Sequence, residues 1–82
     1  MASSPTILLI DDDLEVGRLL GRALRDEDPC FVLECFASAG DGERAVAEIP
    51  PDCVVLDYRL PDSSGLDCLR RLRRISVDLP VR

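Results

Sequence analysis

Histidine, lysine and tryptophan are absent from the 82-residue chain, so all 10 of its basic residues are arginines. Without histidine, the chain supplies neither a phosphohistidine donor nor an imidazole ligand for a metal ion. Aromatic residues make up only 4% of the sequence. A metal site in this chain must therefore be built from oxygen or sulfur ligands.

The chain also has no net positive charge and no long apolar run. Its formal net charge is −6 and its sequence pI is near 4.4, which argues against direct binding to nucleic acid or to an anionic membrane. No apolar stretch approaches the length of a membrane span, and residues 1–5 lack the pattern of a secretion signal. We therefore expect a cytoplasmic protein.

The four cysteines show no C-x-x-C spacing. Zinc ligation or a disulfide remains the alternative, but this pattern favours reduced thiols with a structural role. We expect Cys53 to lie in a buried strand and Cys68 in a helix, where cysteine packs as a small hydrophobic residue.

Residues 53–56 are a run of apolar residues that follows two prolines and ends on Asp57. Such a run is typical of a strand buried on both faces of a parallel sheet. Ligands bind beyond the carboxyl ends of such strands, so Asp57 is expected to face a crevice. The loop that follows contains Pro61 and Gly65, and Gly65 allows a positive φ before the next helix. Asp57 is too distant from the next helix to be its cap.

A second apolar run, Ile7–Ile10, lies in a predicted strand at Thr6–Ile10 and ends on three consecutive aspartates. If the two strands are adjacent and parallel, Asp11, Asp12 and Asp57 meet at one edge of the sheet. Carboxylates about 5 Å apart repel by about 3 kcal/mol per pair at an effective dielectric of about 20. A cation or raised pKa values must offset this repulsion. An all-oxygen cluster of this kind suits Mg²⁺.

The segments at residues 7–13 and 54–67, in this order and at this separation, resemble a response-regulator receiver domain (CheY-like) of two-component signalling. The resemblance implies that Asp57 accepts a phosphoryl group from a sensor histidine kinase or a phosphotransfer protein. It also implies that Asp11, Asp12 and Asp57 bind Mg²⁺ with the backbone carbonyl of Arg59. A receiver of this kind is a signalling domain and not an enzyme.

The first helix is expected to follow Asp13, which can cap it. Its predicted buried stripe has helical spacing and contains Val16, Leu19, Leu20, Ala23 and Leu24. Residues 30–36 predict an edge strand, because Glu34 requires access to water. We expect a loop at residues 37–42 and a short helix at residues 43–49 with Ala45, Val46 and Ile49 facing inward.

A third helix is predicted at residues 66–75, and residues 77–82 look like the opening of a fourth strand. The arginines of the first and third helices favour solvated faces. The alternatives are a kinase-docking surface on the first helix and a nucleic-acid patch on the third.

The alternation of strands and helices predicts an α/β fold with right-handed crossovers. The receiver resemblance implies a flavodoxin-like doubly wound parallel sheet with strand order 2-1-3 and the start of strand 4. We expect residues 1–5 to be a disordered leader. Residues 6–82 would then be the N-terminal portion of a receiver domain, truncated after its third helix. Such a piece leaves the third strand with an open edge, which favours a homodimer or a strand-swapped oligomer.

Two other functions fit parts of the sequence. Haloacid-dehalogenase-like phosphatases also use a strand-end aspartate, but their D-x-D-x-[TV] motif is broken here, because Glu15 stands at its last position. A phosphorylation-independent receiver-like interaction module is the second alternative. The intact acidic residues count against that module, and the absence of lysine counts for it. A metal titration combined with phosphodonor treatment distinguishes this module from a phosphoacceptor domain.

Overall fold

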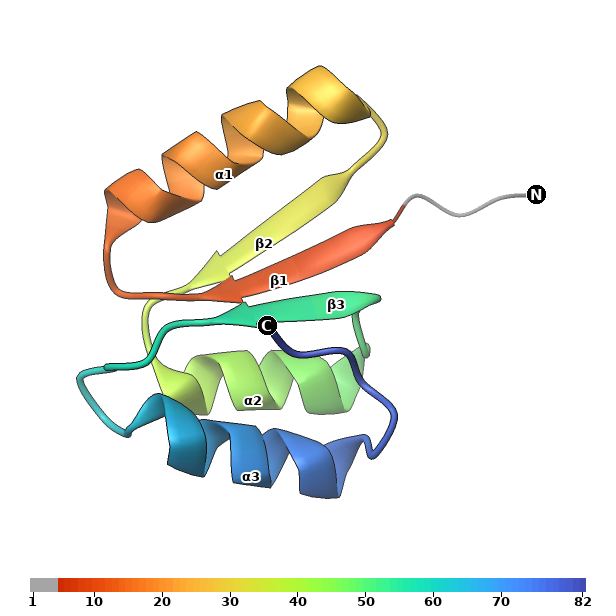
Figure 1. Cartoon of the computed structure of the whole chain (residues 1–82). Coiled ribbons are helices and arrows are strands. Elements are labelled where there is room, and N and C mark those ends of the chain that lie inside the picture. Colours follow the sequence, from red (N-terminus) through yellow and green to blue (C-terminus); the bar gives the residue numbers. More distant parts are fainter. Residues whose placement is uncertain (1–4) are drawn as a thin grey trace.

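The computed structural model describes residues 5–82 as strands and helices that alternate along the chain (Figure 1). The predicted leader lies outside the described residues except for Pro5, whose carbonyl oxygen accepts a hydrogen bond from Val32 N–H. The elements are β1 (Thr6–Ile10), α1 (Leu14–Glu27), β2 (Val32–Phe36), α2 (Ala39–Glu48), β3 (Cys53–Leu56) and α3 (Gly65–Ile75).

The three strands form one parallel sheet in the order β2-β1-β3, as predicted. Ile10 at the end of β1 lies opposite Phe36 of β2 and Leu56 of β3. The carboxyl ends of β1 and β3 are therefore level, and the residues that follow them emerge side by side. β2 lies at the edge of the sheet, where Glu34 is exposed to water, as predicted.

The outer edge of β3 is paired, so the prediction of an open edge is wrong over this stretch. Val54 N–H donates to the Pro80 carbonyl, and Arg82 N–H donates to the Val54 carbonyl, at 2.9 and 2.8 Å. Val81 forms a parallel bridge with Val54. The last residues of the chain thus begin a fourth strand beside β3, as the sequence indicated, and they satisfy backbone groups that would otherwise be unpaired.

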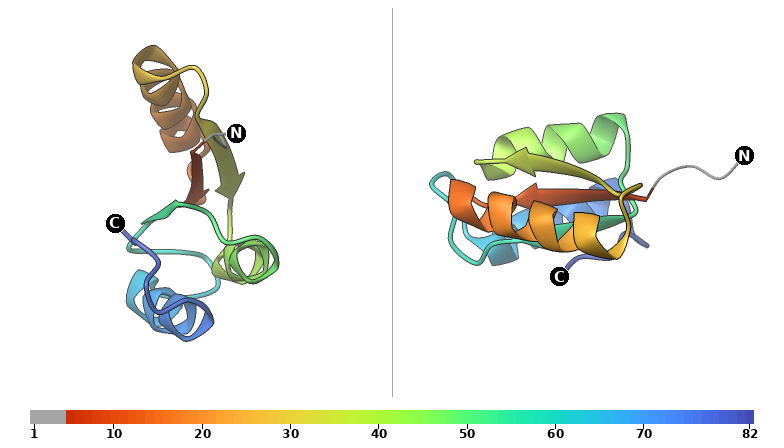
Figure 2. Two further views of the ribbon diagram at one scale, coloured as in Figure 1. Left: turned by 90° about the vertical axis from the view of Figure 1, so that its right-hand side faces the viewer. Right: turned by 90° about the horizontal axis from the view of Figure 1, so that it is seen from above.

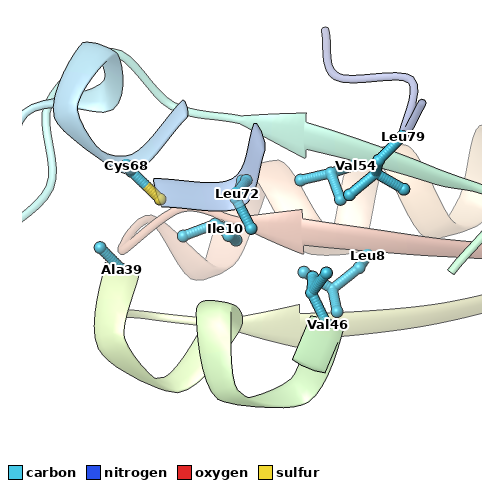
Figure 3. Close-up of a cluster of buried hydrophobic side chains, with 8 residues drawn as sticks. All are labelled: Leu8, Ile10, Ala39, Val46, Val54, Cys68, Leu72 and Leu79. Atoms are coloured by element: carbon cyan, nitrogen blue, oxygen red, sulfur yellow. The ribbon is translucent and has the colours of Figure 1, made fainter. Parts of the chain in front are cut away.

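Helices cover both faces of the sheet, with α1 on one face and α2 and α3 on the other (Figure 2). The main core lies between the sheet and the α2–α3 pair (Figure 3). Alternate residues of a strand face opposite sides, so Leu8 and Ile10 of β1 and Val54 of β3 point into this core. They pack with Ala39, Val46, Cys68, Leu72 and Leu79.

Helix α1 packs on the sheet through its glycines, a result that corrects the predicted buried stripe. A Cβ on Gly17 would lie 3.1 Å from Cys35 Sγ, and one on Gly21 would lie 3.4 Å from a Leu33 methyl group. Glycine at these positions lets the helix backbone approach the strands closely. Of the predicted stripe, Leu20 and Leu24 are half-buried, whereas three residues are exposed: Val16, Leu19 and Ala23.

Helix α2 begins at Ala39, four residues before the predicted start, and the expected loop at residues 37–42 is therefore mostly helix. Ser38 caps it, because its hydroxyl accepts a hydrogen bond from Asp41 N–H at 3.3 Å. The helix tolerates two glycines in its first turn because the cap and tertiary contacts outweigh their low helix propensity. Ile49 lies beyond the helix and is 80% exposed, so its predicted inward position is wrong.

The predicted positions of two cysteines are confirmed, with Cys53 in β3 and Cys68 buried in α3. Burial, followed by the neighbouring Glu43 carboxylate, raises the pKa of the Cys68 thiol to about 12. At pH 8 this thiol is therefore both protonated and inaccessible, whereas Cys30 is exposed.

We expect iodoacetamide at pH 8 to alkylate Cys30 of the native full-length protein and to leave Cys68 unmodified. Peptide mapping by mass spectrometry measures both sites in one sample. The control is the same reaction in denaturant, where the two thiols should react at similar rates. Equal labelling of both in the native protein would contradict the buried position of Cys68.

Candidate functional site

The acidic cluster forms where β1 and β3 end next to each other. The Asp57 N–H donates to the Ile10 carbonyl, and the Asp11 N–H donates to the Phe36 carbonyl, each at 2.9 Å. These two bonds continue the sheet by one residue and fix both backbones. One carboxylate oxygen from each of Asp11, Asp12 and Asp57 lies within 4.8 Å of the others. The structure thus brings together the three aspartates that the sequence singled out.

The three carboxylates differ in their surroundings. Asp11 and Asp57 are half-buried, whereas Asp12 is exposed. One Asp11 oxygen accepts a hydrogen bond from Asp13 N–H at 2.9 Å, which orients this side chain at the turn into α1. The cluster therefore combines oriented oxygens with an open side through which water or a small anion can approach.

Asp13 has a separate role, as its position predicted. It is the N-cap of α1, and its carboxylate accepts a hydrogen bond from Glu15 N–H at 2.9 Å. A cap of this kind satisfies a backbone donor that has no partner within the helix. Three consecutive aspartates are thus divided between the acidic cluster and the start of α1.

The loop after β3 closes on itself and leaves the Arg59 carbonyl free. Gly65 N–H donates to the Tyr58 carbonyl at 2.7 Å, and Leu60 N–H donates to the Ser63 carbonyl at 3.1 Å. Arg59 sits between these two bonded positions, opposite Ser64. Within residues 5–82, no backbone hydrogen bond to the Arg59 carbonyl oxygen is found. That oxygen therefore remains available as a ligand.

Glycine is required at position 65 because there is no room for a side chain, and not because of the backbone dihedral angles. The positive φ that glycine allows is not used here, because no described glycine has one. A Cβ at Gly65 would lie 2.9 Å from Tyr58 Cα and 3.0 Å from the Tyr58 carbonyl oxygen, and it would collide with the Asp57 carbonyl oxygen. The start of α3 is thus pressed against the backbone that carries Asp57.

The donor set of this cluster fits Mg²⁺. Mg²⁺ binds hard oxygen ligands, keeps several waters, and in proteins is held through a small number of carboxylates. Three carboxylates, partly open to solvent, provide these conditions. A metal ion would also offset the mutual repulsion of the carboxylates.

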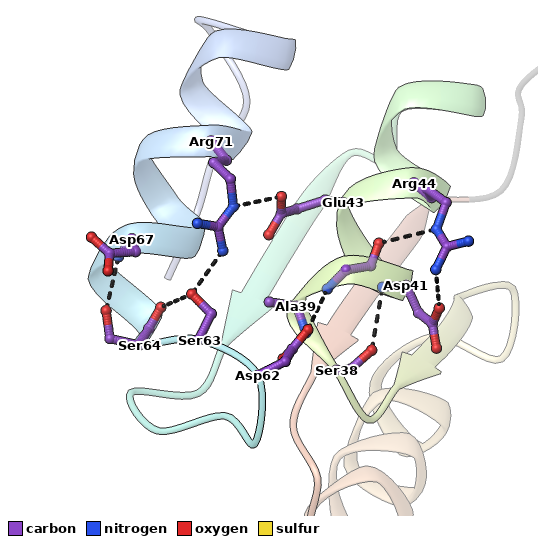
Figure 4. A network of polar contacts seen from close by, with 11 residues as sticks. Ser38, Ala39, Asp41, Glu43, Arg44, Asp62, Ser63, Ser64, Asp67 and Arg71 are labelled. Atoms are coloured by element: carbon purple, nitrogen blue, oxygen red, sulfur yellow. Dashed lines mark hydrogen bonds and ion pairs between the residues drawn. The ribbon is translucent and has the colours of Figure 1, made fainter.

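A second group of polar residues, which joins the loop after β3 to α2 and α3, was not anticipated from the sequence (Figure 4). Asp62 in the loop after β3 accepts hydrogen bonds from the N–H groups of Ala39 and Gly40 in α2, at 2.9 and 3.0 Å. Arg71, expected on a solvated face, donates to Glu43 and to the Ser63 hydroxyl, each at 2.7 Å. No local pattern marks these contacts, because their partners lie on other elements.

Comparison with known proteins identifies the family. The family model of the response regulator receiver domain matches residues 7–82. The chain therefore belongs to the response regulator receiver domain family, which functions in two-component signal transduction. Its parallel 2-1-3 sheet between helices is the receiver fold. Among the described residues, no helix has the length and apolar character needed to cross a membrane.

Three relatives illustrate the family. The chain is 42% identical over 79 residues to the probable transcriptional regulatory protein TcrX of Mycobacterium tuberculosis, covering 93% of this chain and 32% of that protein. It is 36% identical over 78 residues to a protein-glutamate methylesterase/protein-glutamine glutaminase of Trichodesmium erythraeum, covering 92% and 21%. The MaeR response regulator bound to beryllium trifluoride superposes with a TM-score of 0.85 at 27% identity, covering 95% and 64%.

The chain thus spans about a third or less of these two curated relatives. These two relatives have different activities, since one is a probable transcriptional regulatory protein and the other is a protein-glutamate methylesterase/protein-glutamine glutaminase. Membership in the family therefore defines the domain and its signalling class. It does not define the activity of a whole protein that contains it.

Proposed function

We propose that Asp57 is the phosphoacceptor of this receiver domain, and that Asp11, Asp12, Asp57 and the backbone carbonyl of Arg59 hold Mg²⁺. The observation that carries the proposal is the convergence of three carboxylate oxygens within 4.8 Å at the carboxyl ends of β1 and β3. A carboxylate at that edge is reachable from solvent while its backbone is held by the sheet. This combination suits a nucleophile that must meet a large donor.

In the proposed reaction an Asp57 carboxylate oxygen attacks the phosphorus of a phosphohistidine. The new O–P bond gives an acyl phosphate, and the P–N bond breaks with its electron pair leaving on the imidazole nitrogen. When bound, Mg²⁺ supplies positive charge that offsets repulsion between the carboxylates and the phosphoryl oxygens. Asp57 supplies the nucleophilic oxygen, and the sheet holds it in place.

The donor in this proposal is a sensor histidine kinase or a phosphotransfer protein in the cytoplasm. This chain contains no histidine, so the phosphoryl group must come from another segment or molecule. The MaeR response regulator, which has the same fold, is bound to beryllium trifluoride, a group with the shape and charge of a phosphoryl group. The proposal gives the segment itself no enzymatic turnover and no direct contact with nucleic acid or membrane.

Incubation of the full-length protein with acetyl phosphate and Mg²⁺, followed by mass-spectrometric mapping, tests the proposal. We expect a single phosphoryl adduct, on Asp57, that requires Mg²⁺. A protein that binds Mg²⁺ but gains no adduct would instead be a phosphorylation-independent interaction module.

Replacing either Asp12 or Asp13 with alanine should separate the effect on metal binding from the effect on helix capping. We expect Asp12→Ala to weaken Mg²⁺ binding and to leave thermal stability nearly unchanged, because Asp12 is exposed and belongs to the cluster. Asp13→Ala should cost about 1 kcal/mol of stability and leave Mg²⁺ affinity nearly unchanged, because it removes the N-cap of α1. Calorimetric Mg²⁺ titration and thermal melts of both variants measure the two effects. The reverse ranking would refute this division of roles.

A further inference from the structure

The loop that carries the proposed site is attached to helix α2 through Asp62. Its two carboxylate oxygens accept hydrogen bonds from different backbone groups: Oδ1 from Ala39 N–H at 2.9 Å and Oδ2 from Gly40 N–H at 3.0 Å (Figure 4). Both bonds span more than 20 residues of sequence. One side chain therefore joins the loop after β3 to the first turn of α2.

The donors in this contact depend on Asp62. Ala39 and Gly40 are the first two residues of α2, and N–H groups in the first turn of a helix have no acceptor within that helix. A carboxylate at this end is also favoured by the helix dipole. The hydrogen bond from Gly40, and after it the one from Ala39, contribute most to lowering the pKa of the Asp62 carboxyl, so this group is anionic at neutral pH.

A second contact fixes the same loop from the other side. The Ser63 hydroxyl accepts a hydrogen bond from Arg71 of α3 at 2.7 Å, and Arg71 Nε donates to Glu43 of α2 at 2.7 Å. The Glu43 side chain is only 15% exposed, so this end of the connection is anchored in the packed α2–α3 layer. Adjacent loop residues are thus bound to both helices.

We infer that Asp62 is a positioning residue for the site proposed above. It holds the loop against α2 so that the Asp57 carboxylate and the Arg59 carbonyl lie where a metal ion and a phosphoryl group can meet them. The inference rests on the proposed function. Its physical basis is that exposed loops move, and that oxygens held in place before the ligand arrives bind it more tightly than oxygens that must first be ordered.

Substitution of Asp62 tests the inference in the full-length protein. Asp62→Ala removes both acceptors, and Asp62→Asn keeps one acceptor but loses the charge. We expect Asp62→Ala to weaken Mg²⁺ binding roughly tenfold, the usual effect of losing a group that orients a ligand, and Asp62→Asn to weaken it less. Phosphorylation by acetyl phosphate should slow at limiting Mg²⁺ and recover at saturating Mg²⁺. Amide hydrogen exchange at Ala39 and Gly40 should accelerate.

Asp41→Asn is the matched control. Asp41 lies in the same first turn of α2, and the variant loses the same charge. Among the described residues, the exposed Asp41 carboxylate pairs only with Arg44 on its own helix, at 2.8 Å. We expect its Mg²⁺ affinity to stay within about twofold of the wild type, since it touches no part of the loop. All titrations are made at a temperature where thermal melts show every variant folded, and Asp62→Asn decides the test if Asp62→Ala does not fold.

The possible results separate the two proposals. Asp62 variants with faster exchange at Ala39 and Gly40 but with the Mg²⁺ affinity of Asp41→Asn would overturn the positioning role and leave the proposed function intact. Equal rate losses at limiting and saturating Mg²⁺ would also overturn it, because they indicate general damage to the fold. A wild-type protein that neither binds Mg²⁺ nor gains a phosphoryl group would refute the proposed function itself.

Discussion

Asp57→Asn should abolish phosphorylation of the full-length protein by acetyl phosphate. The amide keeps the shape of the carboxylate but has no nucleophilic oxygen able to form a stable acyl phosphate. Because Asp57 is half-buried at the end of β3 and its N–H bonds to Ile10, the substitution should leave the fold intact. We expect the adduct to fall to background in intact-protein mass spectra.

Asp67→Asn provides the control for this experiment. Asp67 is an exposed carboxylate of α3, and within residues 5–82 it forms an ion pair only with Arg70 on the same helix, at 3.4 Å. The variant loses the same charge as Asp57→Asn, but it lies outside the acidic cluster, so its adduct should match that of the wild type. An adduct that persists in Asp57→Asn, or one mapped to another residue, would contradict the assignment of the phosphoacceptor.

Gly65→Ala should destabilise the protein and weaken Mg²⁺ binding together. The added methyl group collides with the Asp57 carbonyl oxygen and would lie 2.9 Å from Tyr58 Cα, so backbone must move. Forced movement of this kind costs about 1–3 kcal/mol. The moving backbone is the one that carries Asp57 and leads to Arg59, so the oxygens of the proposed Mg²⁺ site move with it. Urea denaturation and calorimetric Mg²⁺ titration measure the two effects.

Gly40→Ala is the matched substitution. A Cβ at Gly40 would contact only an Asp62 oxygen at 3.5 Å, an ordinary van der Waals distance. Alanine is favoured over glycine within a helix by about 0.5–1 kcal/mol, so this variant should be at least as stable as the wild type. Similar losses in both variants would show that Gly65 is not under special steric constraint.

The positions of β1 and β3 and the acidic cluster were predictable because their signals are local, whereas β2 begins at Val32, two residues after the predicted start. The runs that form β1 and β3 are short, apolar and bounded by prolines or by aspartates, and the observed bounds equal the predicted ones. The position of Asp57 followed from a general rule of parallel sheets, that strand ends gather at one edge. Asp13 was identifiable as a cap because it directly precedes a helical pattern.

Predictions failed where tertiary contacts overrode the structural preference of a short stretch of sequence. Two glycines near residue 40 predicted a loop, but Ser38 and Asp62 together supply acceptors for the first turn of α2, which therefore forms there. In α1 the apolar residues Val16 and Leu19 were expected inside, but the helix approaches the sheet at Gly17 and Gly21, and both apolar residues are exposed. The helical spacing of apolar residues in the sequence predicts neither outcome.

Short runs of residues and their order along the chain were enough to indicate the receiver family, the order of the elements and the aspartates that meet at the sheet edge. The contact of Asp62 with α2 and the close approach of Gly65 to the Asp57 backbone became visible only in the folded protein. Asp62 and Ala39 are 23 residues apart, and their contact exists only because the packed sheet and helices bring a loop and a helix end together.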